Sequence, residues 1–372
     1  MSGTRWIALF ASAAVLALVI AACGGGGSSS DSTSSGGGGS SGSELSGEIA
    51  GAGSTAQQAA QEAWIATFEG ENSGVTIAYD PVGSGGGREQ FISKAIAYAG
   101  SDAALSPDEG ELEKAAKRCE PGELVEVPVY VSPIAIVYNL PEVEQLKLDP
   151  ETLAKIFNQE ITEWNDPAIA KDNPGVELPE TRITPVNRSD ESGTTQNFTE
   201  YLSAVVPKVW TYEPEQKWPV KGGEAASGTS GMVEAVAAGE GTIGYADASQ
   251  AGELGKAEIK VGSSWEAPTP EAAAAVLEES PIDKEEVSGK YTFPFKLERK
   301  TESQGTYPIV LTSYAIACTQ YKSASEAELV KAYLEYAISP EGQELAAEQA
   351  GSAPLSAALT KKITPAVEAI EG

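Results

Sequence analysis

The sequence contains no histidine, and only three of its 372 residues are cysteines. The absence of histidine excludes Ser-His-Asp and Cys-His catalysis and most zinc sites, because imidazole is the base or a metal ligand in each of them. The cysteines are Cys23, Cys119 and Cys318. They form no CxxC spacing, so nothing supports a redox or metal motif. We therefore expect neither a metal nor a cofactor.

Basic residues are also scarce. The chain has 25 Lys and Arg against 54 Asp and Glu, which gives a formal net charge of −29. A surface this acidic argues against nucleic-acid binding, which needs a basic footprint, and against adhesion to anionic lipid headgroups. It does not argue against a small anionic ligand, because local dipoles and hydrogen bonds can hold an anion in a dry cleft whatever the net charge.

The first 23 residues have the pattern of an export signal. Arg5 supplies the positive start, and the apolar run 6–22 is too short for a comfortable membrane span. Small residues stand directly before Cys23, which resembles the lipobox of bacterial lipoproteins, in which the cysteine is lipidated and becomes the first residue of the mature chain. A plain signal peptide with an incidental cysteine is the alternative.

A tether rich in Gly and Ser, residues 24–45, follows the signal. Its composition cannot bury a core, so we expect a flexible segment that spans roughly 25 Å root-mean-square over twenty residues. A lipid anchor, a tether and a globular body of about 330 residues suggest a protein that works just outside a membrane. Outside the cell Cys119 and Cys318 can pair, so a disulfide and two buried free thiols are both open.

The segment 187–194 is the main candidate for a ligand site. A short β-rich run precedes it and apolar residues at helical spacing follow it, so three of its residues lie at a helix N-terminus, where backbone N–H groups lack partners. These residues are Ser192, Gly193 and Thr194. Arg188 lies just before them, and Asp190 is close enough to hold its guanidinium. Together these groups favour an oxyanion site, and an ordinary Ser cap with a surface ion pair is the alternative.

Three more Gly-rich turns open onto predicted helices. The turn at 51–55 places Thr55 as a helix cap, and the turn at 83–87 offers the Ser84 hydroxyl. Neither fits the dinucleotide fingerprint or the P-loop. The Ser-Gly-Thr turn at 227–229 lacks a neighbouring Arg or Asp, so we interpret it as structural, with ligand contact as the alternative.

Asp102 follows another strand-like run. A carboxylate inside an anion site repels the ligand unless the ligand carries a proton to donate to it. Near neutral pH phosphate carries such a proton and sulfate does not. Asp102 therefore predicts discrimination between these two anions.

Short strand patterns alternate with helical ones, which predicts an α/β architecture with mostly parallel sheets. The longest strand-like run is 125–140, a second apolar strand spans 308–317, and the polar segment 168–181 is predicted to be a loop. The predicted helices include 88–97, 108–117, 149–157 and 326–339. In such sheets ligands bind beyond the strand C-termini, where the Gly-rich turns would lie.

Six short motifs occur in order along the body of the chain. They are Gly-Ala-Gly-Ser-Thr (51–55), Gly-Ser-Gly-Gly-Gly (83–87), Ser-Asp-Ala-Ala-Leu-Ser (101–106), Ile-Thr-Glu-Trp-Asn-Asp (161–166), Arg-Ser-Asp-Glu-Ser-Gly-Thr (188–194) and Gly-Thr-Ile-Gly-Tyr (241–245). In this order the chain resembles the PstS-type phosphate-binding family, the extracytoplasmic substrate-binding components of phosphate ABC importers. The resemblance covers nearly the whole body.

The resemblance implies a phosphate shell of eight residues. These are Thr55, Ala56, Ser84, Asp102, Arg188, Ser192, Gly193 and Thr194. Asp102 would accept the proton of the phosphate, and Asp190 would orient Arg188. The family often has an aromatic residue where this chain has Ala56, a departure that matters little if only the backbone N–H is used.

The resemblance also implies a type II-like periplasmic-binding-protein fold, with two mixed sheets flanked by helices and two hinge strands. One lobe would comprise 46–136 plus 308–372, and the other 137–307. Phosphate would lie between the lobes, and each would supply part of the shell. Closure would then be favoured only when the anion bridges both lobes.

We therefore expect a monomeric, lipid-anchored phosphate receptor on the outer face of the cytoplasmic membrane. It would deliver phosphate to ABC permease subunits, bind no nucleic acid and catalyse no reaction. The first alternative is a receptor for another tetrahedral oxyanion, such as sulfate, molybdate or tungstate. The others are a phosphohydrolase on the same scaffold and a structural or adhesive surface lipoprotein.

Overall fold

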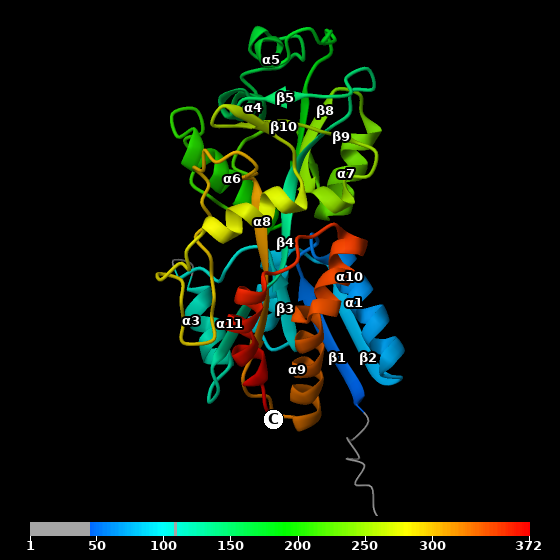
Figure 1. The fold of residues 1–372 in the computed structure, drawn as a ribbon, viewed down its shortest axis with the longest axis vertical. Coiled ribbons are helices and arrows are strands. Elements are labelled where there is room, and N and C mark those ends of the chain that lie inside the picture. The colour runs from blue at the N-terminus through cyan, green and yellow to red at the C-terminus, as the bar shows by residue number, and fades with distance from the viewer. Residues whose placement is uncertain (1–44, 108–109) are drawn as a thin grey trace, which may run out of the picture. The chain divides into compact units, whose positions relative to one another are not determined.

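Strands and helices alternate along residues 45–107 and 110–372, the part of the chain that the computed structural model describes (Figure 1). The predicted export signal, Cys23 and the tether up to residue 44 lie outside these residues. The strands are β1 (Ser46–Gly53), β2 (Gly74–Asp80), β3 (Tyr98–Ser101), β4 (Leu124–Tyr138), β5 (Lys147–Leu148), β6 (Thr184–Arg188), β7 (Glu224–Ala226), β8 (Thr242–Asp247), β9 (Gly255–Lys256), β10 (Glu258–Val261), β11 (Ser264–Glu266) and β12 (Val310–Cys318). The α-helices are α1 (Gln58–Glu71), α2 (Ser84–Ile92), α3 (Glu111–Arg118), α4 (Pro150–Phe157), α5 (Pro167–Asp172), α6 (Gly193–Val205), α7 (Gly228–Ala238), α8 (Pro270–Glu279), α9 (Ala324–Ile338), α10 (Pro340–Ala350) and α11 (Ala357–Glu368).

Nine strands form one sheet and three form a smaller one. The large sheet has the order β2-β1-β3-β12-β4-β8-β6-β7, with β9 paired to β4, and the small sheet has the order β11-β10-β5. The pairs at both ends of the large sheet are parallel, whereas β12 and β4 in the middle run antiparallel to their neighbours. The α/β class with mixed sheets is confirmed. The prediction of mostly parallel pairing is wrong for the centre, because the chain crosses the sheet in one direction on β4 and returns in the other on β12.

β4 belongs to both halves of the large sheet (Figure 1). It pairs with β12 from Leu124 to Pro133 and with β8 from Ile134 to Tyr138. All 15 of its residues are buried, because strands lie on both edges and α7, α8 and α11 contact it. Beside the change of partner, the Ile134 amide donates to the Ile309 carbonyl at 2.7 Å. The fold is thus the two-lobed one, and the exact lobe boundaries named above stay a prediction.

The amphipathic helix predicted at 326–339 is confirmed as α9. Its apolar stripe, which includes Val330, Tyr333 and Leu334, is buried, and the helix contacts β1, α10 and α11. Burial of each such side chain contributes about 1.5 to 3 kcal/mol. α9 therefore holds β1, and with it the turn that follows β1, in place.

Two predicted boundaries are wrong for identifiable reasons. The helix predicted to begin at residue 88 begins at Ser84, so the glycines belong to α2 itself. A Cβ at Gly87 would lie 2.4 Å from the Gly53 Cα, so these glycines allow α2 to pack against the end of β1. The loop predicted at 168–181 begins with α5, because the Asp166 side chain accepts from the Ala168 amide and a proline fills the first helical position.

Cys119 and Cys318 form a disulfide, so the alternative of two free thiols is wrong. Cys119 directly follows α3, and Cys318 is the last residue of β12. Both are buried in a small apolar cluster with Phe91 and Leu124. The disulfide therefore links the residue after α3 to the end of β12, where Cys318 pairs with Leu124 of β4.

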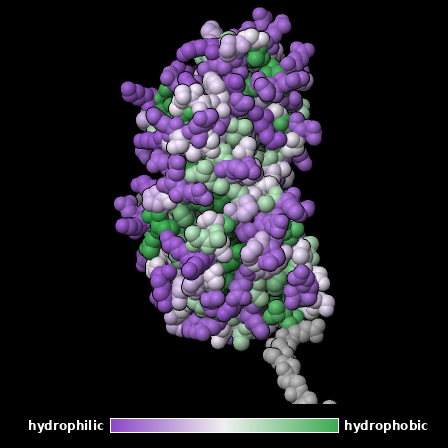
Figure 2. Space-filling model, viewed as in Figure 1, coloured by the Kyte–Doolittle hydropathy of each residue, from purple (hydrophilic) through white to green (hydrophobic). Residues whose placement is uncertain are grey.

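Hydrophilic side chains cover most of the face seen in Figure 2, in agreement with the acidic composition. Within residues 45–107 and 110–372, no helix combines the length and the apolar character that a membrane span needs.

Candidate anion-binding site

Turns that are far apart in the sequence converge on Asp102, the residue directly after β3. Its Oδ1 atom accepts hydrogen bonds from the Ser54 hydroxyl and from the Ser313 hydroxyl at 2.6 Å. Its Oδ2 atom accepts from the Thr194 hydroxyl at 3.1 Å. The side chains come from the turn after β1, from β12 and from the start of α6, and only 3% of Asp102 is exposed. The structure thus gathers hydroxyl donors around a buried carboxylate.

Burial raises the pKa of Asp102, because it removes the ionised form from water. The hydrogen bonds from Ser313, Ser54 and Thr194 and the charge of Arg188 lower this pKa and so oppose the effect of burial. These four groups favour the ionised form, in which the carboxylate is an acceptor only.

Ser84 and Gly193 lie against Asp102. The Ser84 hydroxyl oxygen accepts from the Asp102 amide at 3.1 Å. A Cβ at Gly193 would lie 2.8 Å from both the Ser84 Oγ and the Asp102 Cβ, so a larger residue there would push α6 away from this turn. Glycine therefore allows the N-terminus of α6 to approach Asp102 closely.

Ser192 caps α6. Its Oγ atom accepts from the Thr195 amide at 3.2 Å, as the alternative interpretation of this residue proposed. The cap uses a lone pair of the hydroxyl oxygen and not its hydrogen. The amides of the first turn, those of Gly193 and Thr194 among them, lie at the positive end of the helix dipole.

Arg188, the last residue of β6, forms an ion pair with Asp190. Its Nε donates to Asp190 Oδ1 at 2.7 Å and its Nη2 donates to Oδ2. Only 3% of Arg188 is exposed, and its backbone amide donates to the Tyr245 hydroxyl at 3.2 Å. Asp190 thus occupies the edge of the guanidinium formed by Nε and Nη2, and a guanidinium has further N–H donors, on Nη1, that a second acceptor can use. Burial raises the pKa of Asp190, and the hydrogen bond and charge of Arg188 outweigh that effect and lower it.

The prediction that Thr55 caps the first helix is wrong. The Ser54 Oγ atom accepts from the amides of Ala56 and Gln57, both at 3.1 Å, in the turn before α1, and the N-cap residue Gln57 makes no side-chain cap hydrogen bond. The Thr55 Oγ1 atom instead lies 2.9 Å from the Thr229 Oγ1 and accepts from the Thr229 amide at 3.2 Å. Thr55 thus joins the turn after β1 to the start of α7.

Taken together, the site offers hydroxyls, helix N-termini, one buried guanidinium and one acceptor carboxylate, which is a set of groups that holds an oxyanion. In the described part of the chain, no group of three or more Asp, Glu or Cys side chains is arranged to hold a metal ion.

The comparisons with known proteins agree with this chemistry. A family model described as a PBP superfamily domain matches residues 38–341. Phosphate-binding protein PstS2 of Mycobacterium bovis (strain BCG / Pasteur 1173P2) is 37% identical over 328 residues, which is 87% of each chain. Phosphate-binding protein PstS 3 of Mycobacterium leprae (strain TN) is 37% identical over 292 residues, which is 77% of each chain. The chain belongs to the PstS-type phosphate-binding protein family.

Solved structures share the fold of this PstS-type protein. A high affinity periplasmic phosphate-binding protein (PfluDING), solved with phosphate bound, aligns with a TM-score of 0.70 at 21% identity, over 86% of this chain and 93% of the other. A human phosphate binding apolipoprotein aligns with a TM-score of 0.67 at 20% identity, over 85% of this chain and 93% of the other. At these identities the likeness establishes the fold alone.

The sequence analysis missed several side chains of the candidate site. Ser54 and Ser313 donate to Asp102, and Thr229 meets Thr55. Thr229 belongs to the Ser-Gly-Thr turn at 227–229, which we interpreted from the sequence as structural. The sequence feature that could have indicated Thr229 is that this turn repeats the Ser-Gly-Thr of 192–194. Ser313 is a polar residue inside an apolar strand, a weak sign that it faces a partner.

Asn197 and Arg299 were also missed. The Asn197 Nδ2 atom donates to the carbonyl of Asp102 at 2.6 Å and to that of Gly193 at 2.9 Å. Arg299 donates to the Asn197 side chain and to the carbonyls of Pro308 and Val310. These contacts join the Asp102 turn and α6 to the start of β12.

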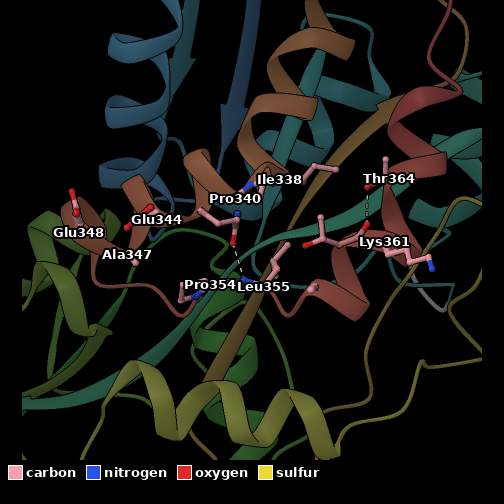
Figure 3. A pocket seen from close by; sticks show the side chains of 12 residues that line it. Ile338, Pro340, Glu344, Ala347, Glu348, Pro354, Leu355, Lys361 and Thr364 are labelled. Carbon is pink, nitrogen blue, oxygen red and sulfur yellow. Dashed lines mark hydrogen bonds between the residues drawn. The ribbon is translucent and has the colours of Figure 1, made fainter.

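Two cavities border the candidate site. One, of about 550 Å³, is lined by Asp102, by Asn197 and by further acidic side chains, among them Glu200 and Glu215. The other, of about 470 Å³, is lined by Arg188 and Asp190. A third, of about 810 Å³, lies between α10 and α11, where Pro340 and Leu355 form apolar walls near Glu344 (Figure 3). Lys361 also lines this third cavity, but none of the candidate site residues named above does.

Proposed function

We propose that this PstS-type protein binds inorganic phosphate between its lobes and delivers it to the permease of an ABC importer. The observation that carries the proposal is Asp102, a buried carboxylate that accepts three hydroxyl hydrogen bonds beside a helix N-terminus and Arg188. An acceptor carboxylate at an anion site favours a ligand that brings its own proton. Hydrogen phosphate meets that condition, and the names of the relatives support the same ligand.

The proposed shell is the set of eight residues named from the sequence, with Asp190 as the residue that orients Arg188. Arg188 would pair with the anion through the Nη1 end of its guanidinium. Ser84, Thr55 and the first turn of α6 would donate hydroxyl and amide hydrogen bonds. Ala56 would contribute its backbone amide when Ser54 releases it.

Because these residues come from both proposed lobes, phosphate would favour the closed arrangement. Contacts such as that between Thr55 and Thr229 already join the two sides. A ligand that adds hydrogen bonds to both sides shifts the equilibrium by its differential affinity for the closed state.

Calorimetric titration of the purified protein, unfolded and refolded to remove carried-over anion, tests this function. We expect phosphate to bind one to one near neutral pH, and sulfate to give no heat of binding. Asp102→Asn should lower the ratio of phosphate to sulfate affinity by about tenfold or more, because an amide can donate to a fully deprotonated oxyanion.

Glu191→Gln is the control for the change in net charge. Glu191 is half exposed, lies next to the cap of α6 and pairs with Lys217 at 2.6 Å. Its substitution should leave the selectivity unchanged. Binding of sulfate, molybdate or tungstate in place of phosphate would favour the receptor for another tetrahedral oxyanion, and an unchanged ratio in Asp102→Asn would refute the role of this carboxylate.

We further propose that the protein is a binder and not an enzyme. The shell groups stabilise an anion in its ground state, and the histidine-free chain offers no base of the usual kind. The phosphohydrolase alternative predicts turnover of a chromogenic phosphate ester with or without divalent metal ions, which the titrated protein should not show.

A lipid anchor on Cys23 would place a monomeric receptor on the outer face of the cytoplasmic membrane, beside its permease. The lipobox-like sequence and the Gly/Ser tether support this location. Cys23→Ser should move the protein from the membrane fraction to the soluble extracytoplasmic fraction without changing phosphate binding. Membrane retention of the variant would count against the anchor.

A further inference from the structure

A line of buried polar side chains runs from α9 through α1 to the Asp102 carboxylate. Its members are Tyr333, Gln61, Gln57, Ser313 and Asp102. None of the five is more than 3% exposed. Because water cannot complete hydrogen bonds at this depth, each donor in the line needs an acceptor among its neighbours.

One backbone carbonyl fixes the direction of the whole line. The Gln57 Nε2 atom donates to the carbonyl of Tyr314 at 3.1 Å, and a carbonyl can only accept. The amide of Gln57 cannot be turned around, so its Oε1 atom faces Gln61 and accepts from the Gln61 Nε2 at 2.8 Å. The Gln61 Oε1 atom then faces Tyr333, whose hydroxyl donates to it at 2.7 Å.

The same direction determines where the Ser313 hydrogen points. The Ser313 Oγ atom accepts from the Gln57 Nε2 at 2.6 Å. Its own hydrogen is therefore directed to Asp102 Oδ1, which lies 2.6 Å away. A hydroxyl that is approached by a donor on one side is forced to donate on the other.

Ser54 is constrained in the same way by a different part of the chain. Its Oγ atom accepts from the amides of Ala56 and Gln57, and these two donors occupy its lone pairs. Its hydrogen is also directed to Asp102 Oδ1. Two forced donors thus meet at Oδ1. The Oδ2 atom accepts from the Thr194 hydroxyl and keeps a second lone pair that can accept the hydrogen of a ligand.

We propose that this relay is the specificity device of the site: Gln57, Ser313 and Ser54 hold Asp102 as an acceptor, so that the site takes an oxyanion carrying a proton and rejects a fully deprotonated one. The proposal rests on the function proposed above and deepens it. The three residues are positioning residues, since they act through Asp102. Burial raises the pKa of Asp102 and the hydrogen bonds from Ser313 and Ser54 lower it, which agrees with this role.

Ser313→Ala is the principal test, with phosphate and sulfate titrated from pH 6 to pH 9. Loss of one forced donor should raise the pKa of Asp102, so that a protonated Asp102 can donate to sulfate. We expect the phosphate-to-sulfate affinity ratio to fall by about tenfold at pH 6 and to recover as the pH rises. A purely structural defect would not recover with pH.

Thr312→Val is the matched control. Thr312 precedes Ser313 on β12, is 1% exposed, and its hydroxyl has no hydrogen-bond partner among the described residues. The variant should keep the wild-type ratio at every pH. Gln57→Glu should act like Ser313→Ala, because the new carboxylate would draw the Ser313 hydrogen away from Asp102, and it replaces the principal variant should Ser313→Ala fail to fold.

Wild-type protein that does not bind phosphate would defeat the proposed function and not the relay alone. Given wild-type binding, three results would overturn the relay. They are an unchanged ratio in folded Ser313→Ala, an equal loss of affinity for both anions at all pH values, and the same pH profile in Thr312→Val.

Discussion

Replacement of Arg188 by methionine is expected to weaken phosphate binding roughly a hundred- to a thousandfold. Arg188 is the buried cation of the proposed shell, and the nearby Asp102 and Asp190 both carry carboxylates. Without the guanidinium, the hydroxyl groups and helix N-termini would have to hold the anion beside two carboxylates and with no buried cation. Calorimetric titration of phosphate gives the affinity directly, and circular dichroism checks that the variant is folded.

The double variant Arg188→Met, Asp190→Asn separates two causes of that loss. Asp190 also accepts from the Gly228 amide at 3.1 Å, so asparagine can keep its place in the turn through its Oδ1 atom. If repulsion from the unpaired Asp190 contributes, the double variant should bind phosphate about tenfold more tightly than Arg188→Met. Wild-type affinity in folded Arg188→Met would show that the anion lies elsewhere.

In the wild-type protein we expect the buried Glu126 to lower the free energy of unfolding as the pH rises from 4.5 to 8. Replacement of Glu126 by glutamine is expected to abolish this decrease. Glu126 lies on β4, is fully buried, and accepts from the Leu105 amide at 2.9 Å through Oε1. Its Oε2 atom has no partner among the described residues. Burial raises the pKa of Glu126 from its ordinary value of 4.5 to about 8, with nearby Glu286 and Glu111 adding to the effect and Arg88 opposing it.

The direction of the pH dependence follows from this raised pKa. Below pH 4.5 the carboxyl group is protonated in both the folded and the unfolded chain, and its contribution to stability is fully present. As the pH rises toward 8, the unfolded chain releases the proton while the folded chain retains it, so the free energy of unfolding falls by about 3 to 5 kcal/mol. Above pH 8 the folded form ionises as well and the contribution of Glu126 levels off.

Urea unfolding at several pH values measures this effect as the difference between Glu126→Gln and wild type. Burial raises the pKa of Asp247 to about 6, so Asp247 also makes the stability depend on pH. Because Asp247 is present in both proteins, its contribution cancels when the free energies of unfolding are subtracted. The difference should grow from pH 4.5 to pH 8 and then stay constant. Glu123→Gln serves as the control, because Glu123 lies at the surface beside Lys290, and it should show a small difference without this slope. A flat difference for Glu126→Gln would mean that the buried carboxyl is solvated.

The features that the sequence predicts correctly are those that depend on neighbours along the chain. The Gly-rich turns lie after strands and before helices, and Arg188 pairs with Asp190 two residues away. The helical stripe of α9 is likewise a local pattern. The motif order also indicated the two-lobed fold, because it matches an arrangement already known in a family.

The features that the sequence does not reveal depend on pairing over long distances. Ser313 reaches Asp102 across 211 residues, and Thr55 reaches Thr229 across 174. The alternating apolar residues of β4 are typical of a strand with one face toward water, yet the sheet buries both faces and Glu126 with them. Which polar residue meets which is set by the register between β4 and β12, and periodicity carries no information about that register.

The position of β12 between β3 and β4 also has a consequence for the order in which the protein is made. β4 ends at Tyr138, whereas β12 ends at Cys318, so the strand that fills the centre of the sheet is synthesised last among the three. At common rates of synthesis, roughly 10 to 40 s separate the two events. Until then β3 and β4 have unpaired edges, which are templates for contact with other chains. The residues between β4 and β12 can begin to pack during this interval, whereas Cys119 can form its disulfide only after Cys318, 199 positions further along the chain, has been synthesised.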